Sequence, residues 1–121
     1  MHDYIKMMTQ NTEAFTCKDI NKLGSHLADD YASIRIEAGE VIKRTSSKEK
    51  TLQVLQRMFD TVPLKGSQLD RIMIVGDHVV AVEKDTFDTP AGEKTTTTLG
   101  VYHMQEDKIW RAYSFPIEED S

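Results

Sequence analysis

The chain has 121 residues, of which 39% are hydrophobic and 29% are charged, and its formal net charge is −5 at pH 7. That length and composition predict one folded domain over residues 1–121 with its own core, and they exclude a disordered chain. The acidic balance argues against a nucleic-acid partner, because phosphate binding needs a basic face.

The single cysteine and the first residues indicate the cellular location to expect. Cys17 has no second cysteine to pair with, so a reducing, cytoplasmic setting is expected. Residues 1–6 have neither the apolar run nor the small-residue cleavage site of a signal peptide. No segment approaches the apolar length that crosses a membrane, so no membrane partner is expected.

Two helices are predicted at the N-terminal end. The first covers residues 3–15. The second begins at Thr16, where Asp19 follows three residues later as in a capping box, and it ends at Asp29 and Asp30. Apolar residues at helical spacing define the two helices: Tyr4, Ile5, Met8 and Phe15 in the first, and Ile20, Leu23 and Leu27 in the second.

A strand, a turn and a third helix are predicted next. Residues 31–36 form a strand, residues 38–40 turn the chain, and residues 41–42 form a short second strand. Ser46 can cap a helix, and Pro63 ends it because the residue before a proline avoids the helical region. The apolar stripe of this helix consists of Leu52, Leu55, Met58 and Phe59.

The last third of the chain predicts an antiparallel meander. Four apolar, β-branched runs follow one another with only short turns between them, and links this short join antiparallel neighbours. The runs cover residues 68–75, 78–87, 93–104 and 109–115. With the helices that precede them, they predict an α+β fold in which a curved sheet covered by helices encloses a pocket.

Two acidic side chains are the leading candidates for chemistry. Strand alternation places Glu83 and Asp85 on one face of the 78–87 run, together with Phe87. Residues two apart on a strand have Cα atoms about 7 Å apart. In an apolar cone, one of these carboxyls could have a raised pKa and act as a general acid or base. The alternative is that both lie on a solvated rim of the sheet.

The other candidates come from neighbouring strands and from the third helix. His103 lies in mid-sheet and could be a base near neutral pH, although a lone histidine there is more often structural or at a dimer contact. Trp110 and Ala112 share a face by alternation, so Trp110 could form a flat wall beside the space that Ala112 leaves; core packing explains Trp110 equally well. Tyr31 could offer its hydroxyl to a ligand, and Phe59 adds to the apolar lining.

No metal site and no cofactor are predicted. The four histidines contain no pair at the spacing of helical zinc sites, and one cysteine cannot build a structural zinc site. The glycines form no phosphate loop, and there is no Gly-x-Ser-x-Gly elbow. A site that joins His103 to Asp85 or Glu83 across strands is a weaker alternative.

The order of elements and several short motifs resemble those of the nuclear-transport-factor-two-like superfamily. This superfamily includes ketosteroid isomerases, scytalone dehydratases, limonene epoxide hydrolases and polyketide-cyclase-like proteins. Residues 23–31 resemble its leucine-rich helix followed by Ala-Asp-Asp and an aromatic residue, and residues 76–80 resemble its Gly-Asp-x-Val-Val hairpin. Residues 100–109 resemble Gly-Val-Phe-x-Val followed by Gly-Lys-Ile, and residues 110–113 resemble its closing Trp-Arg-x-Tyr.

The resemblance covers nearly the whole chain and implies a cystatin-like cone, in which about three helices pack on the concave face of a curved antiparallel sheet. It also implies a homodimer through the outer face of the sheet. Val80 and Val82 alternate with Val79 and Ala81, so both faces of that strand are apolar near its start. A sheet with one solvated face would not need that pattern.

The limonene epoxide hydrolases of this superfamily carry Arg-x-Asp-x-Phe in the corresponding strand and Trp-Arg-Asp-Tyr in the closing strand. Asp85 and Phe87 match the first motif, but Glu83 stands at the Arg position and Ala112 stands at the Asp position of the second. Two of the three catalytic residues are therefore missing. A methyl group cannot orient a water molecule, so epoxide hydrolysis by that triad is disfavoured.

Two functions are compatible with the sequence. The first is an isomerase, cyclase or lyase that binds a small, mostly apolar molecule and uses Asp85 as a general base, with His103, Tyr31 or Glu83 as partners. The second is a non-catalytic dimeric module that holds a ligand or a protein partner. The pH dependence of Asp85, and the effect of Asp85→Asn on ligand affinity, distinguish the two.

Overall fold

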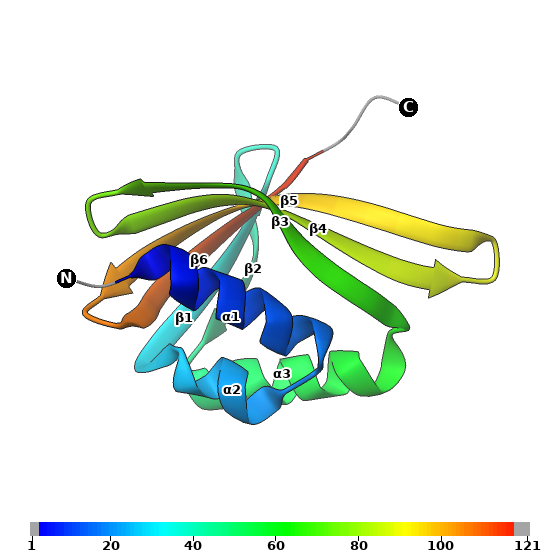
Figure 1. The fold of residues 1–121 in the computed structure, drawn as a ribbon, viewed down its shortest axis with the longest axis horizontal. Helices are drawn as coiled ribbons and strands as arrows, with labels where there is room; N and C mark the ends of the chain where they lie inside the picture. The colour runs from blue at the N-terminus through cyan, green and yellow to red at the C-terminus, as the bar shows by residue number, and fades with distance from the viewer. Residues whose placement is uncertain (1–2, 118–121) are drawn as a thin grey trace.

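Six strands form one curved sheet, and three helices cover one of its faces (Figure 1). The coordinates are a computed structural model, which describes residues 3–117. In chain order the elements are α1 (Tyr4–Thr16), α2 (Ile20–Ser25), β1 (Leu27–Glu37), β2 (Glu40–Ser46), α3 (Lys48–Thr61), β3 (Leu64–Val75), β4 (His78–Thr89), β5 (Gly92–Gln105) and β6 (Lys108–Ile117).

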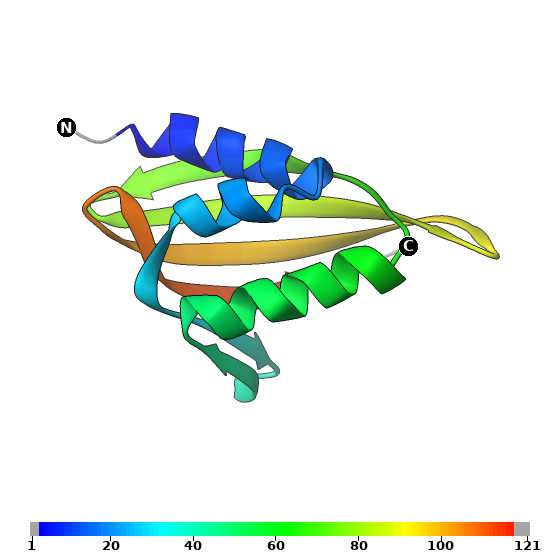
Figure 2. The ribbon, with the colours of Figure 1, turned by 90° about the horizontal axis from the view of Figure 1, so that it is seen from below.

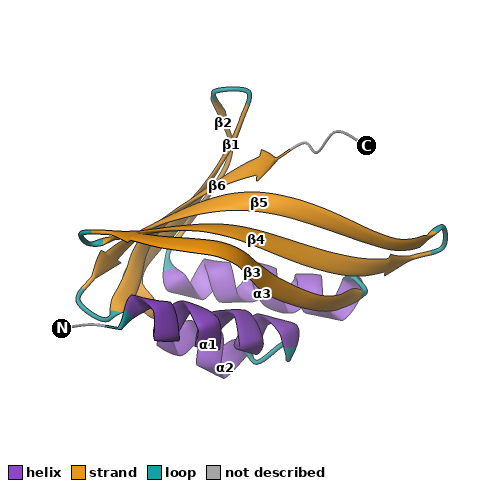
Figure 3. Cartoon of the chain, turned by 45° about the horizontal axis from the view of Figure 1, so that its top comes forward, coloured by secondary structure: helices purple, strands orange, loops and turns teal. Residues whose placement is uncertain are grey.

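The sheet has the strand order β2-β1-β6-β5-β4-β3. The strands β3 to β6 pair as antiparallel neighbours and confirm the predicted meander, whereas β1 pairs in parallel with β6. The helices lie together over the concave face (Figure 2), and the part of the chain described here places no helix on the convex face (Figure 3). This α+β cone confirms the predicted fold class. No helix within residues 3–117 is long and apolar enough to cross a bilayer.

The predicted second helix is too long. The helix α2 ends before Asp29 and Asp30, which lie inside β1. The amide of Ile109 donates to the carbonyl of His26 at 2.8 Å, so pairing with β6 starts directly after α2 and draws the chain into the sheet. The helix also begins later than predicted, because the side chain of Asp19 is its N-cap.

The start of α3 and both ends of β2 differ from the prediction. Ser47, and not Ser46, caps α3 by accepting a hydrogen bond from the Lys50 amide at 3.2 Å. The helix ends before Pro63, as predicted. The strand β2 is longer than predicted because Glu40–Ser46 pairs with β1 along its length.

Two buried clusters fill the space between the helices and the concave face. The first contains residues of α1, β1, β4, β5 and β6, and the second contains residues of α1, α2, α3 and β3. The first consists of Met8, Leu27, Tyr31, Val79, Met104, Ile109 and Ala112, and the second consists of Ala14, Leu23, Phe59 and Leu64. Burial of these side chains supplies the main driving force for folding.

A β-bulge near the start of β6 changes which side chains face the core. The register between β5 and β6 shifts by one residue there, so Trp110 is an extra residue on β6. Ile109 and Ala112 are both in the buried core, while Trp110 lies on the convex face with its ring centroid 5.2 Å from that of His103. The prediction that Trp110 and Ala112 share a face is wrong, because regular alternation stops at a bulge.

Candidate active site

A partly open cavity of about 170 Å³ lies between the helices and the concave face of the sheet. Its lining mixes apolar side chains with two carboxyls, two phenols and several hydroxyl or amide groups. The lining residues are Asn11, Thr12, Phe15, Leu23, Leu27, Tyr31, Thr51, Leu55, Ser67, Glu83, Asp85, Tyr102 and Ile109. The two predicted acidic residues therefore line the same cavity.

Glu83 has the most strongly perturbed carboxyl group of the cavity. Its Oε1 accepts a hydrogen bond from the hydroxyl of Tyr102 at 2.7 Å. Burial raises the pKa of Glu83 to about 7, the Tyr102 hydrogen bond opposes that rise, and the nearby charge of Asp85 adds to it. At neutral pH this carboxyl is thus present in both protonation states, which is the condition for efficient general acid–base catalysis.

Tyr102 reaches Glu83 because the residues between them are small. Tyr102 pairs with Val79, and the next concave-face pair along the two strands is Ala81 with Gly100. A Cβ atom on Gly100 would lie 2.7 Å from the Tyr102 hydroxyl, so only glycine leaves room for the ring to lie along the sheet. Burial, followed by the charge of Glu83, raises the pKa of Tyr102 well above its ordinary value, so the phenol stays a proton donor.

Asp85 is held by a different partner. The hydroxyl of Ser67 donates to Asp85 Oδ1 at 2.5 Å across the β3–β4 pair. The Ser67 amide in turn donates to the hydroxyl of Thr16 at 2.9 Å, which joins this part of the site to the end of α1. Burial raises the pKa of Asp85, and the Ser67 hydrogen bond opposes the rise.

Tyr31 supplies the second phenol of the cavity. Its side chain comes from β1 and is only 8% exposed. Burial raises its pKa to about 12; a hydrogen bond with Ser33 opposes this, and the charge of Glu83 adds to it. Tyr31 is therefore protonated at neutral pH and can donate a hydrogen bond to an oxygen atom in the cavity.

The other predicted site residues do not line this cavity. Phe59 and Ala112 are part of the buried clusters, and Phe87 packs against the second cluster. His103 and Trp110 lie on the convex face, so the predicted cooperation of His103 with Glu83 or Asp85 is wrong. The reason is alternation: the neighbours of His103 on β5 already point into the core.

Tyr102 and Ser67 are site residues that the sequence-based prediction missed. A glycine two positions before an aromatic residue on the same strand face could have indicated the path of the Tyr102 ring. No comparable signal exists for Ser67, because its position opposite Asp85 depends on the β3–β4 register. That register contains two irregularities, which a sequence pattern does not predict.

Comparisons with known proteins bear on the fold. No protein-family model and no curated protein matches this sequence. An epoxide hydrolase from M. tuberculosis described as LEH-like superposes with a TM-score of 0.76 at 18% identity, covering 93% of this chain and 81% of that one. An NTF2-like protein of unknown function from Cytophaga hutchinsonii gives 0.75 at 10% identity, covering 97% and 92%. A protein from Catenulispora acidiphila with a ketosteroid isomerase-like fold gives 0.75 at 14% identity, covering 89% and 82%.

The fold and the cavity together define a class of protein. A curved sheet, helices over its concave face and ionisable side chains in the space between them form an α+β cone with a candidate small-molecule site. The superpositions identify this cone as the NTF2-like fold, which is the fold that the resemblance implied. Isomerase-like and epoxide-hydrolase-like proteins share this fold, and a fold alone does not select among activities.

Proposed function

We propose that this protein is an enzyme that moves a proton within a small, mostly apolar molecule, as an isomerase, cyclase or lyase does. Glu83 is the general base of this proposal. The sequence favoured Asp85 for that role, but the surroundings of Glu83 suit it better. The observation that carries the proposal is a carboxyl with a pKa of about 7 in a cavity that also holds two protonated phenols.

The arrangement supports abstraction of a proton from a carbon atom beside a carbonyl group. The ionised Glu83 takes the proton as the C–H bond breaks, and the electron pair moves onto the carbonyl oxygen as an enolate. The hydroxyl of Tyr31 can donate a hydrogen bond to that oxygen, where charge develops. Where the substrate carries a β,γ double bond, the enolate extends to the γ-carbon, and protonated Glu83 returns the proton there. The double bond then lies between the α- and β-carbons, the carbonyl group forms again, and Glu83 is restored as the base.

The size of the cavity limits the substrate. An engineered apolar cavity of about 150 Å³ takes up benzene, and this cavity measures about 170 Å³. A ligand of about one ring therefore fits without rearrangement. Because the cavity is partly open, a longer molecule would place one ring inside and extend the rest toward solvent.

Hydrogen–deuterium exchange tests this proposal without knowledge of the natural substrate. Cyclopentanone and cyclohexanone are incubated with the protein in deuterated buffer, and loss of the α-proton signal is followed by NMR. We expect exchange above the buffer rate, and a fall of about 10²–10⁴-fold in Glu83→Gln. Asp88→Asn is the matched control, because Asp88 is an exposed acid on the same strand. Equal exchange in wild type and Glu83→Gln would contradict the proposal.

A non-catalytic ligand-binding module is the second candidate. It is favoured by the hydrogen bond that already occupies one oxygen of Glu83, since a tyrosine held this way can serve structure alone. In that case the ketones bind without any exchange above the buffer rate, and Glu83→Gln leaves their affinity unchanged.

We also propose that two copies associate through the convex face of the sheet. Apolar side chains form a row in register across five strands there: Ile34, Tyr113, Val101, Val80 and Met73. A continuous apolar surface of this kind is typical of an interface. Light scattering at micromolar concentration should give a dimer for wild type and a monomer for Val101→Glu. The control is Val54→Glu on α3, which should remain a dimer; a monomeric wild type would contradict the proposal.

A further inference from the structure

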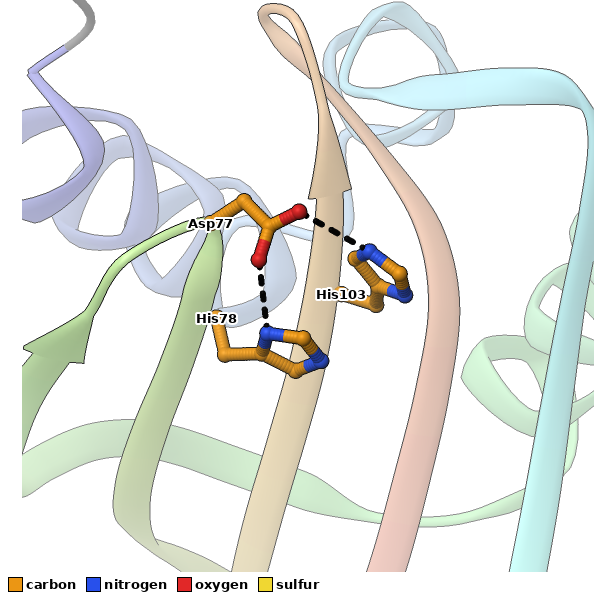
Figure 4. Close-up of side chains that lie close together, drawn as sticks. All are labelled: Asp77, His78 and His103. Atoms are coloured by element: carbon orange, nitrogen blue, oxygen red, sulfur yellow. Dashed lines mark hydrogen bonds and ion pairs between the residues drawn. The ribbon is translucent and has the colours of Figure 1, made fainter.

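Three side chains with metal-binding groups meet on the convex face, away from the cavity. They are Asp77, His78 and His103, at the β3–β4 turn and the adjoining end of β5 (Figure 4). Asp77 Oδ1 lies 2.8 Å from His78 Nδ1, and Asp77 Oδ2 lies 3.1 Å from His103 Nε2. The two imidazole rings stack with centroids 4.2 Å apart. One carboxylate thus orients both rings.

The backbone fixes this cluster before any ligand binds. His78 and His103 are direct partners in the β4–β5 register, so their side chains stand next to each other on one face. Gly76 has a φ of +61° and precedes Asp77 in a two-residue hairpin turn, where glycine is favoured at the first position. The amide of Met104 donates to the Asp77 carbonyl at 2.8 Å, which ties the turn to β5.

We propose that Asp77, His78 and His103 form a binding site for a divalent transition-metal ion such as Zn²⁺. One donor atom from each residue lies within 4.8 Å of the others, and metal–ligand bonds of about 2.0–2.2 Å bring such atoms together after small side-chain rotations. Two imidazoles with one carboxylate suit zinc and its neighbours in the first transition series, whereas Ca²⁺ and Mg²⁺ prefer oxygen ligands throughout.

Metal binding would replace the present hydrogen bonds without leaving a group unpaired. A carboxylate can only accept, so each ring now directs an N–H toward Asp77. Imidazole binds metals through a nitrogen without a proton. Binding therefore removes the proton from each coordinating nitrogen, to solvent or to the other nitrogen of the same ring, and the freed nitrogen and the carboxylate oxygen bind the ion.

In the single chain the surroundings leave the site open to solvent and support its shape. The side chains of Asp77, His78 and His103 are 62%, 41% and 32% exposed, so an ion can reach them. The rings of Trp110 and His103 pack nearly at right angles, with centroids 5.2 Å apart. Arg111 lies over the Trp110 ring and donates to the carbonyls of Asp30 and Trp110. Three protein ligands leave a position for water or for a group from another molecule.

Zinc titration of untagged protein tests the proposal. Cys17 is exposed and could bind zinc by itself, so all variants carry Cys17→Ser. Calorimetry should show one Zn²⁺ per chain, and His78→Ala and His103→Ala should each weaken binding by at least about tenfold. His2→Ala, a change outside the described residues, is the control and should bind as the parent does.

Cobalt gives a second and independent measurement. Bound Co²⁺ absorbs visible light according to its ligands, and its paramagnetism broadens NMR signals nearby. We expect broadening confined to the β3–β4 turn and the adjoining end of β5, and its loss in Asp77→Asn, which keeps the shape of the side chain but removes its charge. Absence of Zn²⁺ binding by the parent, or equal binding by folded His78→Ala and His103→Ala, would overturn the proposal. Circular dichroism establishes that each variant is folded.

Discussion

Replacing Tyr102 by phenylalanine should raise the pKa of Glu83. The substitution keeps the buried ring and removes only the hydroxyl that donates to Glu83 Oε1 at 2.7 Å. This hydrogen bond lowers the pKa of Glu83 against the effect of burial, so its loss leaves burial unopposed. A hydrogen bond to a charged group contributes about 1.5–3 kcal/mol, and about 1.4 kcal/mol corresponds to one pH unit. The midpoint should therefore rise by about one to two pH units.

The assay is a ¹³C NMR titration of the side-chain carboxyl of Glu83 in labelled protein. Tyr113→Phe is the control, because Tyr113 lies on the convex face and its loss should leave the Glu83 midpoint unchanged. If Glu83 is the general base, the rate of α-proton exchange increases with pH as Glu83 ionises. The midpoint of that increase should lie at a higher pH in Tyr102→Phe, by the same amount as the Glu83 pKa. A Glu83 midpoint that stays the same or falls in this variant would refute the reasoning about the cavity.

Three further predictions concern stability and the neighbouring groups. The pKa of Glu83 is 4.5 for the free side chain and about 7 in the fold. The free energy of unfolding of wild type should therefore fall as pH rises between these values, by about 3 kcal/mol in all. Urea unfolding should show that Glu83→Gln lacks this fall. Gly100→Ala puts a Cβ 2.7 Å from the Tyr102 hydroxyl. It should therefore displace that ring, raise the pKa of Glu83 as Tyr102→Phe does, and destabilise the fold by about 1–3 kcal/mol. Ser67→Ala removes the hydrogen bond that lowers the pKa of Asp85, so the Asp85 carboxyl should titrate at a higher pH in the same NMR experiment.

The sequence predicts the fold well where one local rule decides the structure. The β3–β6 meander follows from short turns between apolar runs, and α3 follows from its apolar stripe and the proline after it. The boundaries near Asp29 are predicted wrongly because local helical spacing competes with strand pairing to β6, which is distant in sequence. Such long-range pairing overrides local propensity and leaves no local mark.

The candidate site is predicted only in part, for a related reason. Glu83 and Asp85 reach the cavity because β4 is paired without interruption to β5 and strand alternation holds along it. Trp110 does not reach it, because a single bulge residue on β6 reverses the alternation. The partners that tune the carboxyls, Tyr102 and Ser67, come from the two strands beside β4, and their identity depends on register. A one-residue slip would have put different side chains in both places.

The bulge at Trp110 also explains how one strand serves both faces of the sheet. With regular alternation, Ile109 and Ala112 would point to opposite faces, and one of them would leave the core. The extra residue lets both stay buried, while Trp110 and the guanidinium of Arg111, 4.0 Å from its ring centroid, lie together outside the core. On the convex face the Trp110 ring therefore packs against His103, while Ile109 and Ala112 both remain in the core. The same irregularity in β6 thus keeps Ile109 in the wall of the cavity and places Trp110 beside His103 on the opposite face of the sheet.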